Sequence, residues 1–140
     1  KCHRGTRLDA IAEIEKWIED SDSCPILWLN GPAGSGKSTI SQTIAECCAD
    51  KGKIIASFFF LRGTGERSKI ENLIPTLAHQ VSKQNLAARS ILIDIMSNEP
   101  NPHHEKALSY QLDELLIKPI KATGIESSNN IIIIDALDEC

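Results

Sequence analysis

The chain has 140 residues, which is enough for one domain with a hydrophobic core but not for two. Hydrophobic residues make up 41% and charged residues 24%, a composition that argues against a disordered chain. The net charge of −4 argues against general binding to nucleic acids or membrane surfaces, and the sequence holds no apolar run long enough to span a bilayer.

The cysteines indicate a reducing compartment. There are five, an odd number, with no C-x-x-C pair, and Cys47 and Cys48 are adjacent. This pattern fits neither a disulfide framework nor a zinc site. The chain does not open with a secretory signal, since Lys1–Thr6 is polar. We therefore expect reduced thiols and a cytoplasmic location.

The first third of the chain predicts a helix, a strand, a glycine-rich turn and a second helix. Apolar residues recur at helical spacing within Leu8–Glu19, which is typical of an amphipathic helix. Ile26–Leu29 is a short apolar run bounded by turn residues and predicts a buried strand. Gly31–Gly36 follows, and Ser38–Asp50 carries a helical pattern that Gly52 ends.

The middle of the chain predicts a second strand and two more helices. Ile54–Leu61 is almost entirely apolar, which indicates a strand buried on both faces, with Phe58–Phe60 in the core. The apolar stripe that follows predicts a helix starting near Asn72, so that Pro75 lies in its first turn, where proline is tolerated. Leu86–Met96 predicts a further, less regular helix.

The last third of the chain predicts one more helix and a third strand. Asn98–Pro102 is a turn or linker, and the leucines of Leu108–Leu116 mark a helix that Pro119 is expected to end. Thr123–Asn130 is a polar loop, after which four isoleucines form a strand that ends in Asp135. Because strands and helices alternate, we expect an α/β fold with a parallel sheet that helices cover on both faces.

The most specific motif is a phosphate loop of the form G-x-x-x-x-G-K-[ST], with the required strand predicted before it and the required helix after it. Glycines let backbone N–H groups approach a triphosphate, the helix adds its positive N-terminal end, and Lys37 supplies a cation for the β- and γ-phosphates. Thr39 either bonds the α-phosphate or only occupies the first helical turn. The residues assigned to nucleotide binding are Gly31, Pro32, Ala33, Gly34, Ser35, Gly36, Lys37, Ser38 and Thr39.

The partner of this loop is an acidic motif at the end of the third strand. Ligands of parallel sheets bind at the carboxyl ends of the strands, where Asp135 would lie. Ser38 and Asp135 are predicted to hold Mg²⁺, the aspartate through water, because Mg²⁺ keeps several waters. Asp138 or Glu139 is predicted to polarise the attacking water, with Lys37 as the third catalytic residue. The alternative is that both carboxylates are only solvated.

The identity of the nucleotide is inferred by exclusion. GTPases commonly carry Asp-x-x-Gly after this strand, whereas the sequence here is Asp135-Ala136-Leu137-Asp138. An Asn-Lys-x-Asp motif for guanine is also missing from the sequence. The expected cofactors are therefore ATP, in preference to GTP, and Mg²⁺.

Together these residues resemble the first half of a NACHT-type P-loop NTPase of the STAND signalling class, in particular the fungal set with a NOD-like-receptor architecture. The resemblance runs nearly from end to end of the chain. Its most discriminating block is Asp135–Cys140, in which a small residue follows the Mg²⁺ aspartate and Asp-Glu comes next. The other matching blocks are Gly5-Thr6-Arg7, Ile14 with Trp17, Ile26 to Ile40, and Ser57-Phe58-Phe59-Phe60 with Arg62.

The resemblance implies a three-layer α/β/α P-loop NTPase fold. Residues 1–24 would form a helical lead-in and residues 25–140 the N-terminal part of the NACHT domain, with Walker A at 31–39 and Walker B at 131–139. Slow ATP hydrolysis would switch the protein between a closed monomer and an oligomer. Self-association would run through the NACHT domain and C-terminal repeats, and no nucleic-acid or membrane partner is expected.

Three further segments carry weaker expectations. Gly5–Arg7 has either a role at the adenine or phosphates or that of a helix-entry turn. Arg62 is expected to cap its strand rather than touch a partner. His103-His104-Glu105 is expected to be a loop or helix start rather than a metal site, because adjacent histidines on a helix point away from each other.

The resemblance also implies a missing strand. In this class of fold, a strand that would follow Cys140 lies between the phosphate-loop strand and the Asp135 strand. We therefore expect an incomplete sheet and a fragment that is marginally stable by itself. Three functions remain open at this point: a nucleotide switch with ATPase activity, a P-loop kinase, and a module that binds nucleotide without turnover.

Overall fold

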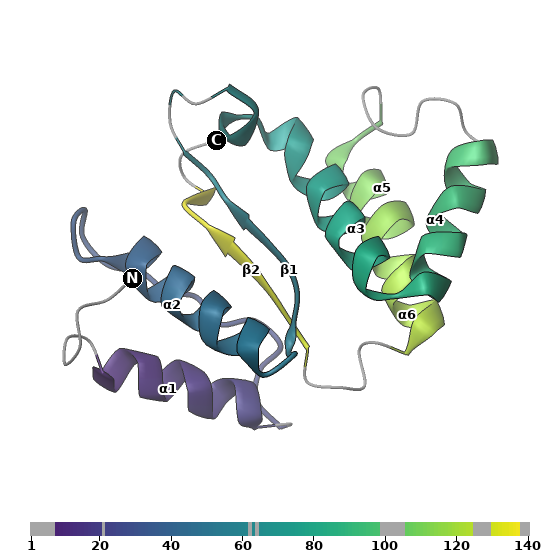
Figure 1. Cartoon of the computed structure of the whole chain (residues 1–140). Helices are drawn as coiled ribbons and strands as arrows, with labels where there is room; N and C mark the ends of the chain where they lie inside the picture. Colours follow the sequence, from purple (N-terminus) through teal and green to yellow (C-terminus); the bar gives the residue numbers. More distant parts are fainter. Residues whose placement is uncertain are drawn as a thin grey trace.

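The computed structural model describes residues 8–20, 22–61, 63, 65–98, 106–124 and 130–137, which form a mixed α/β structure (Figure 1). Most of these residues are helical, and a parallel pair of strands runs between two groups of helices. In chain order the elements are α1 (Leu8–Glu19), α2 (Lys37–Asp50), β1 (Ile54–Phe59), the 3-10 helices η1 (Gly65–Ser68) and η2 (Ile70–Asn72), α3 (Leu73–Gln84), α4 (Leu86–Asn98), α5 (Leu108–Leu112), the π-helical η3 (Asp113–Ile117), α6 (Lys118–Thr123) and β2 (Ile131–Asp135).

The strands β1 and β2 run parallel and side by side. Ile54 lies opposite Ile131 and Phe59 lies opposite Asp135, with a shift in register between Ile54 and Ala56. Parallel neighbours need a crossover connection, which the helices between the two strands supply. The parallel pairing confirms the predicted α/β class, and both strands fall where their apolar runs placed them.

Each face of the sheet packs against its own hydrophobic cluster. In Figure 1, α1 and α2 lie on one side of the strands, and α3 to α6 lie on the other. Ile131 and Ile133 contact the α1–α2 cluster, whereas Phe58 and Phe60 belong to the α3 side, where their rings meet edge to face at 4.8 Å. Leu77 of α3 is 0% exposed within that second cluster. The predicted covering of both sheet faces is therefore confirmed, as is the core position of Phe58 and Phe60.

Most helix boundaries follow the apolar periodicity closely. Helix α1 has the predicted bounds, and α2 begins at Lys37, one residue before the predicted start. Helix α3 begins at Leu73, so that Pro75 lies in the first turn, where its missing N–H leaves no helical bond unmade. Among the described helices, none combines the length and apolarity needed to cross a bilayer.

The segment Ile26–Leu29 is not a strand, contrary to the prediction. It pairs with neither β1 nor β2, and Ile26 and Trp28 are 78% and 73% exposed. Leu29 packs against the α1–α2 cluster. A strand requires backbone pairing as well as apolar side chains, and in the described part of the chain no strand lies beside this segment to provide it.

The helix that starts at Leu108 does not end at Pro119, contrary to the prediction. It continues from α5 through the π-helical η3 into α6, and the N–H of Lys118 donates to the carbonyl of Asp113, five residues back. A π-helical turn is wider than an α-helical one, so the proline ring enters the next turn without breaking the helix. Pro119 is fully buried there, and Gly124, in the left-handed conformation, ends α6.

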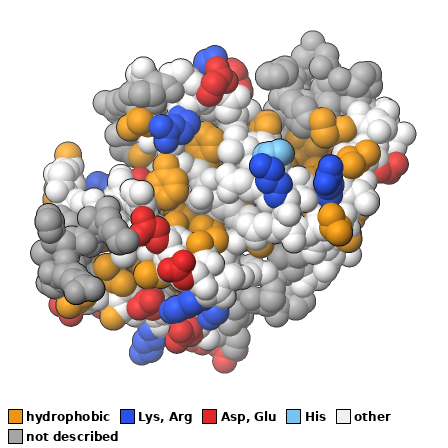
Figure 2. All heavy atoms as spheres, in the orientation of Figure 1, with side chains coloured by type: hydrophobic (Ala, Val, Ile, Leu, Met, Phe, Trp, Pro, Cys, Tyr) orange, Lys and Arg blue, Asp and Glu red, His pale blue; other side chains and the backbone are white. Residues whose placement is uncertain are grey.

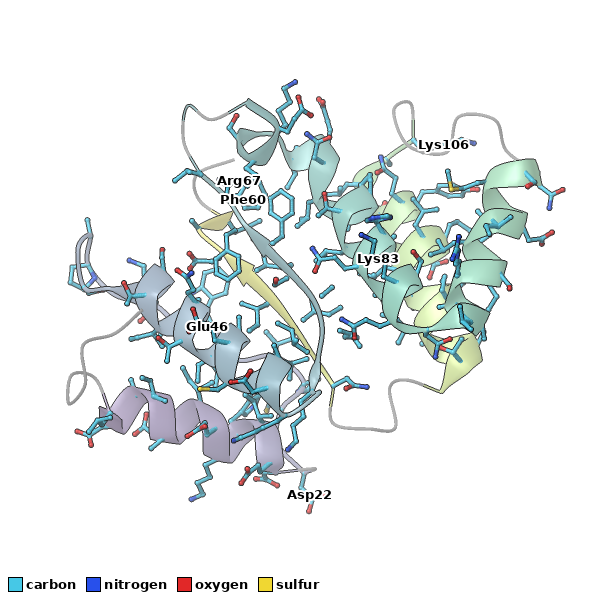
Figure 3. All side chains as sticks on the ribbon, viewed as in Figure 1. Asp22, Glu46, Phe60, Arg67, Lys83 and Lys106 are labelled. Carbon is cyan, nitrogen blue, oxygen red and sulfur yellow. The ribbon has the colours of Figure 1, made fainter. Side chains whose placement is uncertain are left out.

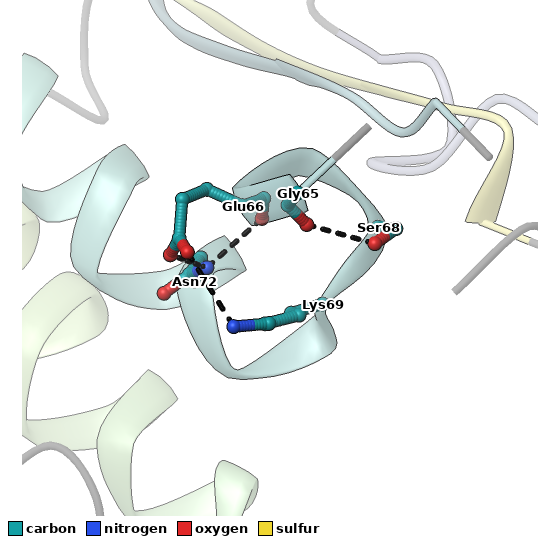
Figure 4. A network of polar contacts seen from close by, with 5 residues as sticks. All are labelled: Gly65, Glu66, Ser68, Lys69 and Asn72. Atoms are coloured by element: carbon teal, nitrogen blue, oxygen red, sulfur yellow. Dashed lines mark hydrogen bonds and ion pairs between the residues drawn. The ribbon is translucent and has the colours of Figure 1, made fainter. Parts of the chain in front are cut away.

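A polar network orders the turn between β1 and α3 (Figure 4). The Asn72 amide donates to the backbone oxygen of Glu66 at 2.9 Å and to its carboxylate at 2.8 Å, and Lys69 lies 3.4 Å from the same carboxylate. The Asn72 hydrogen bond, followed by Lys69, lowers the pKa of Glu66 below its ordinary value. Because the network is exposed, it fixes the path of the turn more than it stabilises the fold.

Two glutamines of α3 bond the backbone of β1. The Gln80 amide accepts from the N–H of Ser57 and donates to its carbonyl, both at 2.8 Å, and Gln84 donates to the carbonyl of Ile55 at 3.2 Å. An unpaired backbone group in a packed region costs free energy. Gln80 therefore takes the place of a neighbouring strand at this point of β1.

We expect the substitution Gln80→Ala to lower the free energy of unfolding by about 1–3 kcal/mol, because it leaves a partly buried backbone N–H and carbonyl without partners. Chemical denaturation of the two proteins measures this difference. Gln84→Ala is the matched control, since it removes one longer bond from an exposed side chain. An equal loss in both variants would contradict the strand-like role of Gln80.

Candidate functional site

The predicted phosphate loop and Asp135, the first residue of the predicted acidic motif, lie at the same end of the two strands. The N-terminal end of α2 and the carboxyl ends of β1 and β2 point the same way in Figure 1. This is the edge at which parallel α/β sheets place their ligands. Gly31–Gly36 leads directly into the N-terminal end of α2, and Asp135 is the last residue of β2.

Glycine is required at two positions of the loop by its backbone conformation. Gly34 and Gly36 have φ angles of 75° and 85°, in the left-handed region that favours glycine. The loop also turns tightly, since the N–H of Ser35 donates to the carbonyl of Pro32 at 3.2 Å. Around Gly34 the space is open, with no heavy atom within 4 Å of where a Cβ would lie. These conformations suit a loop whose backbone turns toward a ligand.

The N-terminal end of α2 carries N–H groups that the helix itself does not use. Gly36 is the N-cap residue, no side chain caps the helix, and the first helical bond runs from the N–H of Ile40 to the carbonyl of Gly36. The amides of the first turn before Ile40 therefore have no partner within the helix. Together with the positive end of the helix dipole, they form a set of donors suited to an anion.

Lys37 lies over the loop that precedes it. Its Nζ donates to the carbonyl of Gly31 at 2.8 Å and to that of Pro32 at 3.2 Å. An ammonium group has three donors, so these two bonds leave one for a ligand. The Lys37 side chain thus holds a positive charge beside the loop.

Asp135 is held against α2 by a hydrogen bond that the sequence did not predict. The hydroxyl of Ser41 donates to its Oδ1 at 3.2 Å, across 94 residues of sequence. The carboxylate is only 7% exposed, and the backbone carbonyl of Asp135 accepts from the N–H of Phe60. Figure 3 shows Phe60 at the end of β1, on the side that faces α3. The pairing of β2 with β1 therefore fixes the position along α2 at which the Asp135 carboxylate contacts the helix.

Two hydroxyl residues of the motif, Ser38 and Thr39, lie on α2 close to Ser41 in sequence. Ser38 is exposed and precedes Ser41 by three residues, so the two lie on the same helix face one turn apart. Thr39 is half-buried, and its carbonyl accepts from the hydroxyl of Thr43 at 2.8 Å. The i, i+3 spacing of Ser38 and Ser41 was visible in the sequence and could have identified Ser41 as a neighbour of the site.

The segment before the loop is tied to the end of α1. The indole Nε1 of Trp17 donates to the carbonyl of Cys24 at 2.8 Å, and the Ser23 hydroxyl donates to the carbonyl of Trp17 at 3.1 Å. These bonds direct the chain from α1 toward the segment that leads into Gly31. Helix α1 thereby contributes to the position of the loop as well as to the hydrophobic cluster.

Several predicted residues lie outside the described part of the chain. These are Asp138 and Glu139, the segments Gly5–Arg7 and His103–Glu105, and Arg62.

Within the described ranges, the thiols of Cys24, Cys47 and Cys48 are free, and burial raises the pKa of the Cys48 thiol.

Comparison with known proteins identifies the family. The profile of a family described as nephrocystin 3, N-terminal, matches residues 6–140. The chain belongs to this family. The match includes both the phosphate loop and the acidic motif, but it is not specific to NACHT proteins, so the NACHT assignment stays a prediction. No curated protein and no solved structure matches the chain.

In this member of the nephrocystin 3, N-terminal, family, the residue after Asp135 has an unusual backbone conformation. Ala136 has a φ of 56°, which is uncommon outside glycine, and it packs against the cluster on the α3 side. The turn that follows the aspartate therefore needs a small side chain. This gives a physical reason for the small residue that the sequence motif carries at this position.

We expect Ala136→Val to lower the free energy of unfolding by about 1–3 kcal/mol, because a β-branched side chain is strained in the left-handed region. Ala136→Gly should change it by less than about 1 kcal/mol, since relief of strain offsets the larger entropy of the unfolded chain. Ala122→Val on α6, at an exposed helical position, is the control. Thermal denaturation would contradict this account if the valine had the same effect at both positions.

Proposed function

We propose that the chain binds ATP with Mg²⁺ at Gly31–Thr39 and hydrolyses it slowly, as the nucleotide-controlled part of a signalling or oligomerisation switch. The proposal includes the P-loop arrangement of an α/β/α fold. It rests above all on one observation: a complete G-x-x-x-x-G-K-[ST] loop caps α2, and Asp135 is hydrogen-bonded to that same helix.

The loop backbone and Lys37 would bind the triphosphate. Support comes from the left-handed glycines at 34 and 36, the open space at Gly34, and the first-turn amides without a helical partner. The Lys37 ammonium would donate to the β- and γ-phosphates, and its bonds to the loop carbonyls of Gly31 and Pro32 support this role. The donors on this side are thus numerous and positive, as a triphosphate requires.

Ser38 and Asp135 would hold Mg²⁺. Their oxygens are ligands of the kind that this cation prefers. Asp135 bonds Ser41, one helical turn beyond Ser38, so a contact from Asp135 through water fits better than direct ligation. The chemistry that Mg²⁺ would supply there is the neutralisation of part of the phosphate charge.

The attacking water would be polarised by Asp138 or Glu139. Both follow Asp135 within four positions of the sequence. The carboxylate would accept a proton from the water as it approaches the γ-phosphate, and Lys37 would stabilise the charge that develops there. The switch itself is proposed from the resemblance to NACHT proteins.

Single-turnover assays with γ-labelled ATP test the proposal against its alternatives. We expect release of labelled phosphate, and we expect chelation of Mg²⁺ to suppress it. ATP that is retained but intact would instead indicate a binding module, and label transferred to an acceptor would indicate a kinase. Light scattering in ATP and in ADP tests the switch, because only a switch changes its oligomeric state between the two nucleotides.

A further inference from the structure

An apolar groove runs between α3 and α4, on the opposite side of the sheet from the phosphate loop. Its volume is about 490 Å³. The floor includes Ala78, Leu92 and Leu115, which are 5%, 6% and 1% exposed. Ile93 and Met96 line the groove as well, and they are 54% and 49% exposed. Apolar side chains thus form both the base of the groove and one wall.

The groove has the dimensions of a helix-binding site. The α3 residues that line it include positions 75, 78, 79 and 82, and the α4 residues are positions 89, 92, 93 and 96. Both sets follow the i, i+3, i+4, i+7 spacing of a helix face, so each wall extends over two helical turns, or roughly 10 Å. Two such faces side by side leave a channel of the kind that receives a third helix.

The rim of the groove is basic. His79 and Lys83 of α3 and Arg89 of α4 line it, and none of the described residues that line it is an Asp or Glu. Figure 2 shows basic and histidine side chains beside hydrophobic ones on this face of the molecule, and Figure 3 shows Lys83 on α3. Among the described ion pairs, none involves Lys83 or Arg89. This rim contrasts with the net charge of −4 of the chain as a whole.

We propose that this groove binds an amphipathic helix of a partner protein, with acidic residues beside its apolar face. The apolar residues of the partner would cover Ile93 and Met96 and reach the buried floor. Its carboxylates would meet Lys83 and Arg89, which fixes orientation and favours acidic partners over basic ones. The inference is independent of nucleotide binding, because the groove uses α3 and α4 and the phosphate loop uses α2.

The test uses a displayed library of helical peptides as the probe. Leucines are fixed at positions i, i+3, i+4 and i+7, and the flanking positions vary among Glu, Lys, Gln and Ser. We expect selection on the protein to enrich Glu at the flanking positions. The absence of any enriched peptide, or enrichment of Lys, would overturn the proposal.

Variants then locate the binding site of the enriched peptides by fluorescence anisotropy. The double substitution Lys83→Glu with Arg89→Glu, and separately Ile93→Ser, should each weaken binding by about tenfold or more. These side chains are exposed, and circular dichroism checks that each variant folds. Lys16→Glu on α1 is a charge-reversal control away from the groove and should leave affinity unchanged. Equal affinity for all variants would place the peptide elsewhere and overturn the proposal.

A lipid surface is the competing occupant, and vesicles containing phosphatidylserine test it. The proposal expects no co-sedimentation of the protein with these vesicles. Sedimentation that the Lys83→Glu and Arg89→Glu changes abolish would assign the groove to a membrane surface instead.

Discussion

Replacing Lys37 by alanine is expected to weaken ATP binding by about 100-fold or more. The Lys37 ammonium is placed over the loop by the carbonyls of Gly31 and Pro32, and it would donate to two phosphates of the nucleotide. Hydrogen bonds to charged groups are worth about 1.5–3 kcal/mol each, and about 2.7 kcal/mol corresponds to a factor of 100 in affinity. Displacement of a fluorescent ATP analogue measures the change.

The Lys37 variant needs a control for charge and for folding. Lys16→Ala removes an exposed lysine from α1 and should leave ATP affinity unchanged. The Lys37 bonds lie at an exposed site, so we expect the thermal midpoint of the Lys37→Ala protein to stay close to that of the wild type. ATP affinity that survives the substitution would refute the role of Lys37.

Removing the water-activating carboxylate is expected to slow hydrolysis by about 10²–10⁴-fold while ATP binding is retained. Asp138→Asn and Glu139→Gln each keep the size of the side chain and remove its charge. Only one of the two should have the large effect, because one general base is sufficient for proton transfer. Single-turnover phosphate release measures the rate, and anisotropy measures binding.

Two results would contradict the assignment of the carboxylates. If neither substitution changes the rate, the catalytic base lies elsewhere. If both abolish ATP binding along with turnover, the pair contributes to the nucleotide site itself rather than to proton transfer.

The fold was predictable wherever local pattern and tertiary packing agree. Most apolar side chains of Leu8–Glu19 and of the run that became β1 belong to the two clusters or pack against them, although Leu8 is 60% exposed. The strand predicted for Ile26–Leu29 was wrong, because an apolar composition reports on the side chains and not on whether the backbone finds a strand to pair with. The prediction that the helix ends at Pro119 was wrong for another reason, because a π-helical turn has no clear signature in sequence.

The candidate site was predictable as a motif but not as a set of contacts. The loop sequence indicates which glycines must turn, and Gly34 and Gly36 have the expected left-handed conformation. The hydrogen bond between Ser41 and Asp135 depends on where the end of β2 lies along α2, which no local sequence pattern encodes. The positive φ of Ala136 likewise arises from the turn that leaves the sheet.

The central claim is that Gly31–Thr39 binds phosphate groups, and calorimetric titration with ATP and AMP in Mg²⁺ tests it most directly. The contacts proposed for the loop are made to the phosphates rather than to the base. We therefore expect ATP to bind with measurable heat and AMP to bind at least about 100-fold more weakly. Equal affinities for the two nucleotides, or no binding of ATP, would contradict the claim.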